Sequence, residues 1–278
     1  MTAQRCPTSP EDWVRECPIT KIWIVLIREY QEIIQQRALI VGMLMPVVIF
    51  IAIPLTAMSG VAFGQSANPT GIGTPTSGLL AGLNQREATQ ALVGQQISVL
   101  YLILPTLLTS IIAAYSIIGE KTARTLEPLL ATPNDTWELL TGKALAALIP
   151  GILLTWLASL IFYRGLQSVA ISQKVVDAVA APGWQVTMVI WTPLLAVIAV
   201  AALTIVSSKV SDARTAQQLS TAVVLPFLVI FLGQAAGWLT LGIQFSFEIA
   251  AILLVLAVVS AYAATRLFQR EAILTRWK

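Results

Sequence analysis

Few residues in this chain could carry out chemistry. It contains no histidine, so a His-based general base, a Ser-His-Asp triad and an HExxH zinc site cannot form. Its two cysteines, Cys6 and Cys17, are not spaced as a CxxC pair, and two thiols without histidine do not complete a four-ligand zinc site. We expect both to be free thiols without a catalytic role.

Gly142-Lys143 is the one dipeptide that could end a phosphate-binding loop of the form G-x-x-x-x-G-K-[ST]. However, Ala144 follows Lys143, and Trp137 stands where the first glycine would be. The sequence therefore contains no ATP-binding loop at this place.

Charged residues make up only 11% of the chain, against about 25% in a typical soluble domain. Six charge-free runs lie between them, at 38–85, 88–119, 144–163, 178–208, 215–247 and 249–265. A membrane-spanning helix needs about 20 apolar residues, with about 17 near the lower limit. This pattern excludes a soluble globular protein and predicts an all-α, polytopic membrane protein with six transmembrane helices.

The six spans are predicted at about 38–58, 96–118, 144–163, 184–208, 219–243 and 249–265, which form a transmembrane domain over 38–265. An even number of spans places both termini on one side. Of the 17 lysines and arginines, 14 fall on that side and three on the other, so the positive-inside rule predicts cytoplasmic termini. Residues 1–37 are then a cytoplasmic tail with an interfacial helix, and 266–278 a cytoplasmic C-terminal tail.

Three segments between the spans are predicted to face outwards. Residues 59–78 are rich in Gly, Pro, Ser and Thr and predict an irregular external loop. Residues 79–95 have a more helical pattern and fit a helix on the outer surface. Residues 233–247 are too apolar for a solvated loop, and predict either a re-entrant hairpin or a longer fifth span.

The segment 22–37 predicts an amphipathic helix directly before the first span. Seven apolar side chains fall within a sector of about 140° when residues advance by about 100° each: Ile22, Trp23, Leu26, Ile27, Tyr30, Ile33 and Ile34. Such a helix lies in the plane of the inner membrane interface. It is either an anchor alone or a part of the mechanism.

The loop 119–143 carries seven charged residues and predicts a helix–turn–helix at the cytoplasmic surface. Thr125 can cap a short helix that Pro133 ends, and Asp135 with Glu138 forms a capping box that starts the next helix. Leu126, Leu129 and Leu130 would then lie beside charges in a fixed arrangement. Apolar side chains among charges favour a docking element for a soluble partner over a simple connector.

These motifs resemble those of type-2 ATP-binding-cassette (ABC) exporter permeases. The resemblance is carried by Glu120-Lys121, by Thr125-Leu126-Glu127-x-Leu129-Leu130-x-Thr132-Pro133, by Glu138-Leu139-Leu140-x-Gly142-Lys143, and by Arg28, Glu29 and Arg37 before a proline-containing first span. It covers most of the chain. The family usually has glycine immediately before Thr-Leu-Glu, where this chain has Arg124.

The resemblance implies a permease subunit of an exporter in the plasma membrane (a bacterial inner membrane), driven by a separate cytosolic ABC ATPase subunit. Because this chain lacks the phosphate-binding loop, ATP and magnesium would be bound by that partner, and this chain needs no cofactor. The residues implied in ATPase coupling are Glu120, Lys121, Arg124, Thr125, Leu126, Glu127, Leu129 and Leu130. Those implied in the interfacial helix are Arg28, Glu29, Tyr30 and Arg37. A second permease copy or homologue would complete a dimer among membrane lipids, and no nucleic acid is expected.

Other functions fit the residues less well. An ion-coupled secondary transporter or a channel normally places ionisable groups at mid-membrane, and the predicted span cores contain no Asp, Glu, Lys or Arg. An intramembrane enzyme would need a buried histidine, a carboxylate pair or a metal set. A non-transporting scaffold remains a further alternative.

Overall fold

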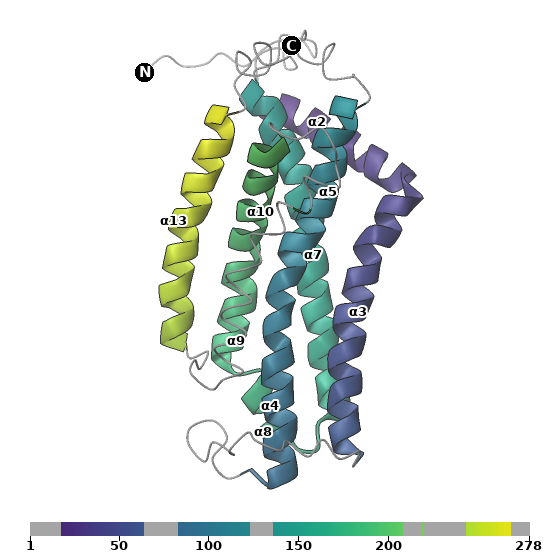
Figure 1. The fold of residues 1–278 in the computed structure, drawn as a ribbon, viewed down its shortest axis with the longest axis vertical. Helices are drawn as coiled ribbons and strands as arrows, with labels where there is room; N and C mark the ends of the chain where they lie inside the picture. Colours follow the sequence, from purple (N-terminus) through teal and green to yellow (C-terminus); the bar gives the residue numbers. More distant parts are fainter. Residues whose placement is uncertain (1–17, 64–82, 123–135, 208–217, 219–242, 268–278) are drawn as a thin grey trace.

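The computed structural model is an all-α bundle in which five helical segments are long and apolar enough to cross a membrane (Figure 1). It describes residues 18–63, 83–122, 136–207, 218 and 243–267. The candidate spans are Arg37–Ala62, Gln85–Ser116, Thr141–Val169, Pro182–Val206 and Gln244–Arg266. They correspond to the first four spans and the last span that the sequence predicts, whereas the predicted fifth span, 219–243, lies outside the described residues except for Ile243.

The described elements are all helical. They are α2 (Pro18–Gln35), α3 (Arg37–Ala62), α4 (Gln85–Val99), η2 (Leu100–Leu102), α5 (Ile103–Thr122), α7 (Thr136–Val169), α8 (Gln173–Val179), α9 (Pro182–Val186), η3 (Thr187–Trp191), α10 (Thr192–Ser207) and α13 (Ile243–Leu267). Helix α7 begins directly after Asp135, as the predicted capping box requires.

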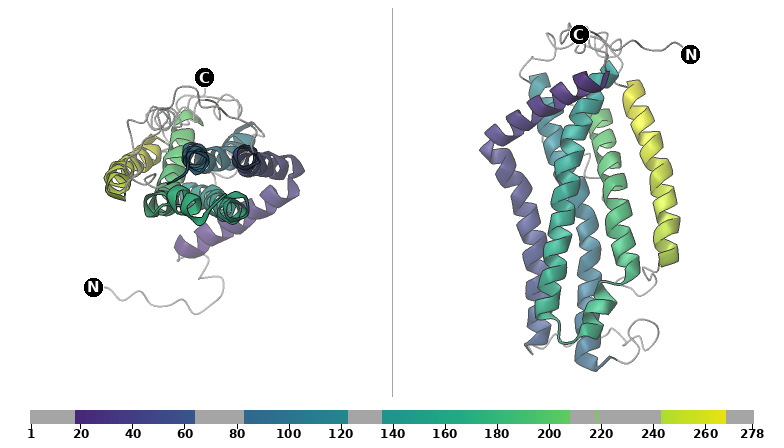
Figure 2. Two further views of the ribbon diagram at one scale, coloured as in Figure 1. Left: turned by 90° about the horizontal axis from the view of Figure 1, so that it is seen from below. Right: turned by 180° about the vertical axis from the view of Figure 1, so that it is seen from behind.

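The helices α4 and α5 form one continuous rod at the centre of the bundle, with a single 3₁₀ turn between them (Figure 2). Of an 18-residue apolar stretch of the span that they form, 78% is buried, whereas only 22% is buried in the corresponding stretches of α3 and α13. The apolar side chains of α3 and α13 are thus mostly left for lipid, and both helices lie at the edge of the bundle.

Residues 85–95 do not lie on an outer surface, contrary to the expectation for 79–95. They form α4, which begins after Asn84, where the Glu87 carboxylate accepts a hydrogen bond from the Asn84 backbone N–H at 2.9 Å. Ala88, Gln90, Ala91 and Gly94 of this helix are buried. The helical pattern is confirmed over 85–95, but the surface position was wrong because the polar side chains of α4 bind the backbone of neighbouring helices, which hydropathy alone does not reveal.

The last span begins earlier than predicted, because α13 includes Ile243 and continues to Leu267. A re-entrant hairpin therefore does not extend through residues 243–247, and residues 233–242 lie outside the described part of the chain. Helices α10 and α13 run in the same direction, so Ser207 and Ile243 lie at opposite ends of the bundle (Figure 1).

The fourth span contains a turn of π-helix, η3, immediately before Pro193. Proline donates no backbone hydrogen bond, and its ring collides with the carbonyl four residues earlier, here that of Val189. The wider π turn relieves this conflict without ending the helix. It also presents Trp191 to α13, where the indole N–H donates to the Ser246 carbonyl at 2.9 Å.

We expect Trp191→Phe to lower the apparent melting temperature of the purified chain, because it removes this hydrogen bond and leaves part of a fully buried site empty. A buried hydrogen bond contributes about 1 kcal/mol, and the lost volume adds to the cost. Trp23→Phe is the matched control, since Trp23 is 59% exposed. Equal melting temperatures for the two variants would contradict the role given to Trp191.

Candidate functional site

A buried ion pair joins three helices at the end of the bundle where α2 lies. The Lys143 ammonium is 2.6 Å from Oε1 of Glu29, and both side chains are less than a tenth exposed. The Ser116 hydroxyl donates to Oε2 of Glu29 at 2.6 Å and accepts from Lys143 Nζ at 3.2 Å. We call Glu29, Ser116 and Lys143 the junction.

Helix α2 presents Glu29 to the bundle because it lies across the end of α7 (Figures 1 and 2). Gln36, in an extended conformation, separates α2 from α3 and lets the chain change direction. Val25, Leu26 and Ile33, one turn away on the same face, pack inward with Glu29.

Gly142 allows this close crossing. A Cβ atom at position 142 would lie 2.8 Å from Val25 Cγ1 and 3.4 Å from the Ile22 carbonyl oxygen. Only a residue without a side chain therefore fits between α2 and α7 at this point. The next residue, Lys143, is held opposite Glu29 as a result.

Two residues of the junction lie on either side of the segment that is predicted to couple to an ATPase. Ser116 lies near the end of α5, and Lys143 lies two turns into α7, 27 residues later. The intervening segment 123–135 connects α5 to α7, and these two helices are hydrogen-bonded to each other and to α2. A displacement of either helix end is thus transmitted to the other two.

Two charges buried in this way hold the three helices strongly together. Moving a carboxylate and an ammonium out of water costs several kcal/mol per ion, which only close pairing and further hydrogen bonds offset. Both oxygens of Glu29 have a partner here. Separating the helices would leave a charge without compensation, so the junction resists being opened one helix at a time.

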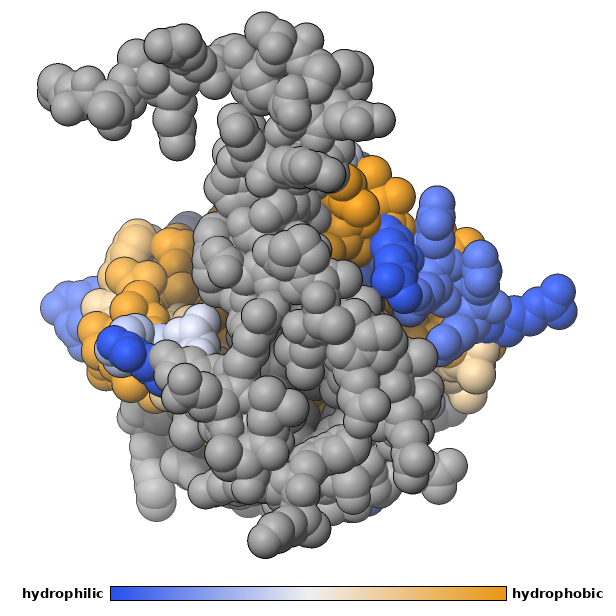
Figure 3. All heavy atoms as spheres, turned by 90° about the horizontal axis from the view of Figure 1, so that it is seen from above, coloured by the Kyte–Doolittle hydropathy of each residue, from blue (hydrophilic) through white to orange (hydrophobic). Residues whose placement is uncertain are grey.

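The apolar face predicted for α2 is divided in two. Leu26 is buried against the bundle, whereas Trp23, Ile27 and Ile34 are exposed. Figure 3, viewed from above, shows hydrophilic side chains on both sides of this end, the larger group on the right, each next to hydrophobic ones. One part of the predicted face thus packs on protein, and the other is available to lipid.

The remaining predicted residues of the interfacial helix have other positions. Arg28 forms an exposed ion pair with Glu32 at 3.2 Å, which contributes little to stability. Tyr30 is partly buried, and this burial raises the pKa of its hydroxyl. Arg37 was predicted to end the interfacial helix but is the first residue of α3, because the helix breaks at Gln36.

The predicted coupling residues lie at or beyond the edge of the described structure. Glu120 and Lys121 belong to the last turn of α5. Arg124, Thr125, Leu126, Glu127, Leu129 and Leu130 lie outside the described residues, so their role stays a prediction.

Sequence reasoning did not predict the pairing of Glu29 with Lys143, or Ser116 at all. One signal was available: Val25, Leu26 and Ile33 surround Glu29 at helical spacing, and a carboxylate on an apolar face needs a partner. Which lysine or arginine pairs with Glu29 depends on how α2 crosses α7. This crossing cannot be read from the sequence of either helix alone.

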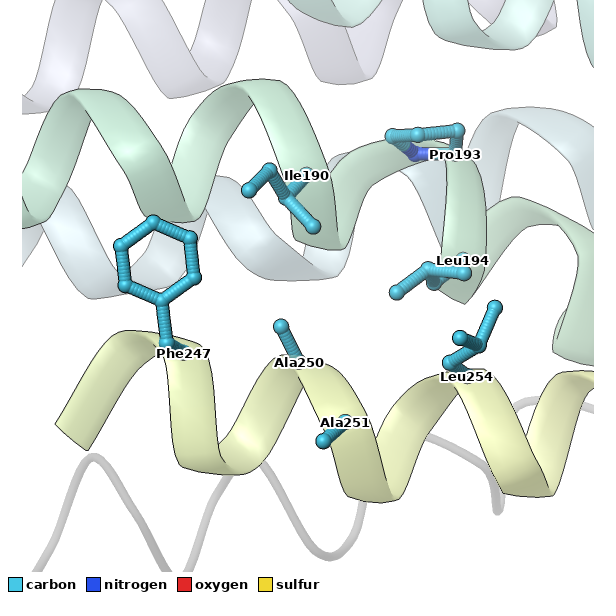
Figure 4. Close-up of a pocket in the computed structure, with 7 residues that line it drawn as sticks. All are labelled: Ile190, Pro193, Leu194, Phe247, Ala250, Ala251 and Leu254. Carbon is cyan, nitrogen blue, oxygen red and sulfur yellow. The ribbon is translucent and has the colours of Figure 1, made fainter. Parts of the chain in front are cut away.

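A second feature is an open groove of about 420 Å³ between the fourth span and α13 (Figure 4). Its lining is entirely apolar: Ile190, Pro193 and Leu194 on one side, and Phe247, Ala250, Ala251 and Leu254 on the other. Such a surface has no group that could orient a polar substrate. Among the described residues, no group of three His, Cys, Asp or Glu side chains could hold a metal ion.

Several long apolar helices packed side by side, with a charged junction at one end, define a multi-pass helical membrane protein. Residues 23–268 match the family described as ABC-2 family transporter protein, and the chain belongs to this family. It is thus an ABC-2 transporter membrane component, a class of permease that typically lacks ATPase motifs. The comparison with curated proteins finds no match.

The ion pair is tested by a double-mutant cycle with Glu29→Gln and Lys143→Met. We expect each single variant to lose about 3–5 kcal/mol of stability, because each leaves a buried charge without its partner. The double variant should be more stable than the sum of the two losses predicts. Apparent melting temperatures of the purified chain would measure this, and strictly additive losses would contradict direct pairing.

The close crossing is tested by Gly142→Val. The new side chain would collide with Val25 and push α2 away from α7. We expect a lower melting temperature and faster proteolysis of α2 in membrane vesicles. Gly42→Val is the matched control, because a Cβ atom at that position of α3 meets open space. If the two variants behaved alike, the crossing would not depend on Gly142.

Proposed function

We propose that this chain is the membrane-spanning permease subunit of an ABC exporter, which moves its substrate across the plasma membrane with ATP hydrolysed by a separate subunit. Membership of the ABC-2 transporter family supports this proposal. So does the sequence around Gly142-Lys143, which departs from a phosphate-binding loop at Trp137 and Ala144. ATP and magnesium would therefore be bound by the partner.

The junction is the observation that carries the proposal. Force from a cytosolic ATPase has to reach the spans through a loop whose two ends are firmly connected to them. The Glu29–Lys143 pair, with Ser116, connects both ends of segment 123–135 to α2. In the proposed mechanism, α2, the end of α5 and the start of α7 move as one unit when the ATPase closes.

The proposal includes six spans with both termini in the cytoplasm. Helices α10 and α13 are parallel, so the chain between them must return across the length of the bundle, which supports one further span in residues 219–243. The distribution of 14 Lys and Arg against three supports the orientation. It puts the junction at the cytoplasmic end, where an ATPase could reach it.

The position of the charges favours ATP-driven over ion-coupled transport. Ion-coupled carriers place ionisable groups near the middle of the membrane. Lys143 lies only three residues into its candidate span, and Glu29 lies outside the spans. The Glu29–Lys143 pair is therefore placed to connect helix ends, and not to bind an ion that crosses the membrane.

The proposed assembly contains a second copy of this chain, or a homologous permease, and the cytosolic ATPase. The exposed apolar side chains of α2, among them Trp23, Ile27 and Ile34, would contact the inner leaflet of a bacterial inner membrane. The charged side of α2 would then face the ATPase.

The proposal is tested by purifying the tagged chain from its native host and identifying co-purifying proteins. We expect an ABC ATPase, and we expect Leu126→Ala, Glu127→Ala and Leu130→Ala together to reduce its recovery at least tenfold, because the apolar docking contacts are lost. Leu145→Ala is the control, since Leu145 is partly exposed on α7 and lies outside the predicted loop 119–143. Full recovery of the ATPase with the triple variant would exclude this coupling site.

A further inference from the structure

Arg164 lies on a face of α7 that is otherwise apolar and exposed. Four large apolar side chains of this face are between 40% and 57% exposed: Leu153, Leu157, Leu160 and Ile161. We call these four residues the α7 stripe. When residues advance by about 100° each, Arg164 falls inside the sector of about 100° that the stripe covers. A face that suits lipid therefore carries a cation close to the end of its helix.

The length of α7 places Arg164 at a boundary of the membrane. The charge-free run 144–163 spans about 30 Å at about 1.5 Å per residue, which is the thickness of the hydrocarbon core. Lys143, which precedes this run, belongs to the junction, and Arg164 follows it directly. A cation on a lipid-facing helix is tolerated where its long side chain brings the charge to the headgroups. Arg164 fits the boundary opposite the junction.

Helix α3 reaches the same boundary at the same level. It lies beside α7 (Figure 2), and a Cβ atom at Gly165 would be only 2.7 Å from Leu55 Cδ1. Residues 38–55 of α3 are free of charge and span about 27 Å at about 1.5 Å per residue. Thr56, the next residue, is polar and exposed. Two neighbouring helices thus agree on where the hydrocarbon core ends.

The chemistry of Arg164 favours a phosphate as its ligand. Arg164 is exposed and forms no ion pair with a carboxylate of the described residues. A guanidinium group stays charged and binds phosphate through two parallel hydrogen bonds. Gln167, about one turn further along α7, is also exposed and carries an amide donor. At the level of the headgroups, the phosphate of a phospholipid is the anion within reach of both side chains.

The α7 stripe adds the second requirement of a phospholipid, an apolar surface below the phosphate. Its side chains continue from Arg164 into the hydrocarbon core, so that an acyl chain can lie against them. A headgroup with a net negative charge fits better than a zwitterionic one, because the latter brings its own cation to the phosphate. Charge and apolar surface together therefore select an anionic phospholipid.

We propose that α7 binds an anionic phospholipid at the end of the bundle opposite the junction. Arg164 and Gln167 bind its phosphate, and an acyl chain lies along the α7 stripe. In the proposed orientation this lipid belongs to the outer leaflet. It fixes the depth of α7, whose other end carries the junction. The site goes beyond the proposed export function and is tested without an ATPase, so either can fail alone.

The test is a titration of the purified full chain in detergent with dioleoylphosphatidylglycerol, in which native mass spectrometry measures the affinity of the first lipid bound. We expect Arg164→Gln to lower this affinity about tenfold, because the charge-assisted hydrogen bonds to the phosphate are lost. Dioleoylglycerol has the same acyl chains without the phosphate, and should bind equally to the parent and to Arg164→Gln. Equal affinities of these two proteins for dioleoylphosphatidylglycerol would overturn the site.

Arg86→Gln is the matched control. It removes the same charge from the same end of the bundle, but Arg86 is an exposed residue in the first turn of α4 and does not lie above the α7 stripe. We expect this variant to keep the parent's affinity. A tenfold loss in Arg86→Gln as well would show attraction by net charge alone and would overturn a site at Arg164. Arg164→Lys should lose less affinity than Arg164→Gln, since the charge remains.

Melting temperatures separate lipid binding from a change in folding. Without added lipid, the parent and Arg164→Gln should melt at the same temperature, because Arg164 is exposed. Dioleoylphosphatidylglycerol should raise the melting temperature of the parent more than that of Arg164→Gln. Inorganic phosphate should raise neither, since it gains nothing from the α7 stripe. An equal rise with inorganic phosphate and with the lipid would assign Arg164 to a soluble anion and overturn the proposal.

Discussion

The pairing of a buried carboxylate with a buried ammonium is the interaction on which the end of the bundle at α2 depends. Glu29 and Lys143 are tolerable inside the bundle only while they remain in contact, since either charge alone would be strongly unfavourable there. Each belongs to a different helix, and Ser116 adds a third. The ion pair and the hydrogen bonds of Ser116 therefore hold the three helix ends together.

The two ends of the bundle are held by different chemistry. At the junction, ions make separation costly. At the opposite end, Gln90 and Gln95 bind backbone carbonyls with neutral hydrogen bonds, and Val175, Val176 and Val179 of α8 are buried in the hydrophobic core. Between them, α4 and α5 form a rod that is mostly buried.

The helices could be predicted from the sequence because charge is excluded from the membrane core, and charge-free runs therefore mark the spans. The position of α4 could not be predicted in this way, since Gln90 is polar yet fully buried and Gln95 is partly buried, and only their backbone partners explain why. The break at Gln36 moved Arg37 out of the interfacial helix. The junction could be suspected from Glu29 among apolar neighbours, but its partner is determined by tertiary packing at Gly142.

The central claim, that the junction moves as a unit, is tested most directly by distances between spin labels. Labels on Arg28 of α2 and Leu145 of α7, both exposed, would report whether these helices separate. In the complex with the proposed ATPase, the account predicts the same Arg28–Leu145 distance with and without ATP. A change of several ångströms between Arg28 and Leu145 on ATP binding would contradict it.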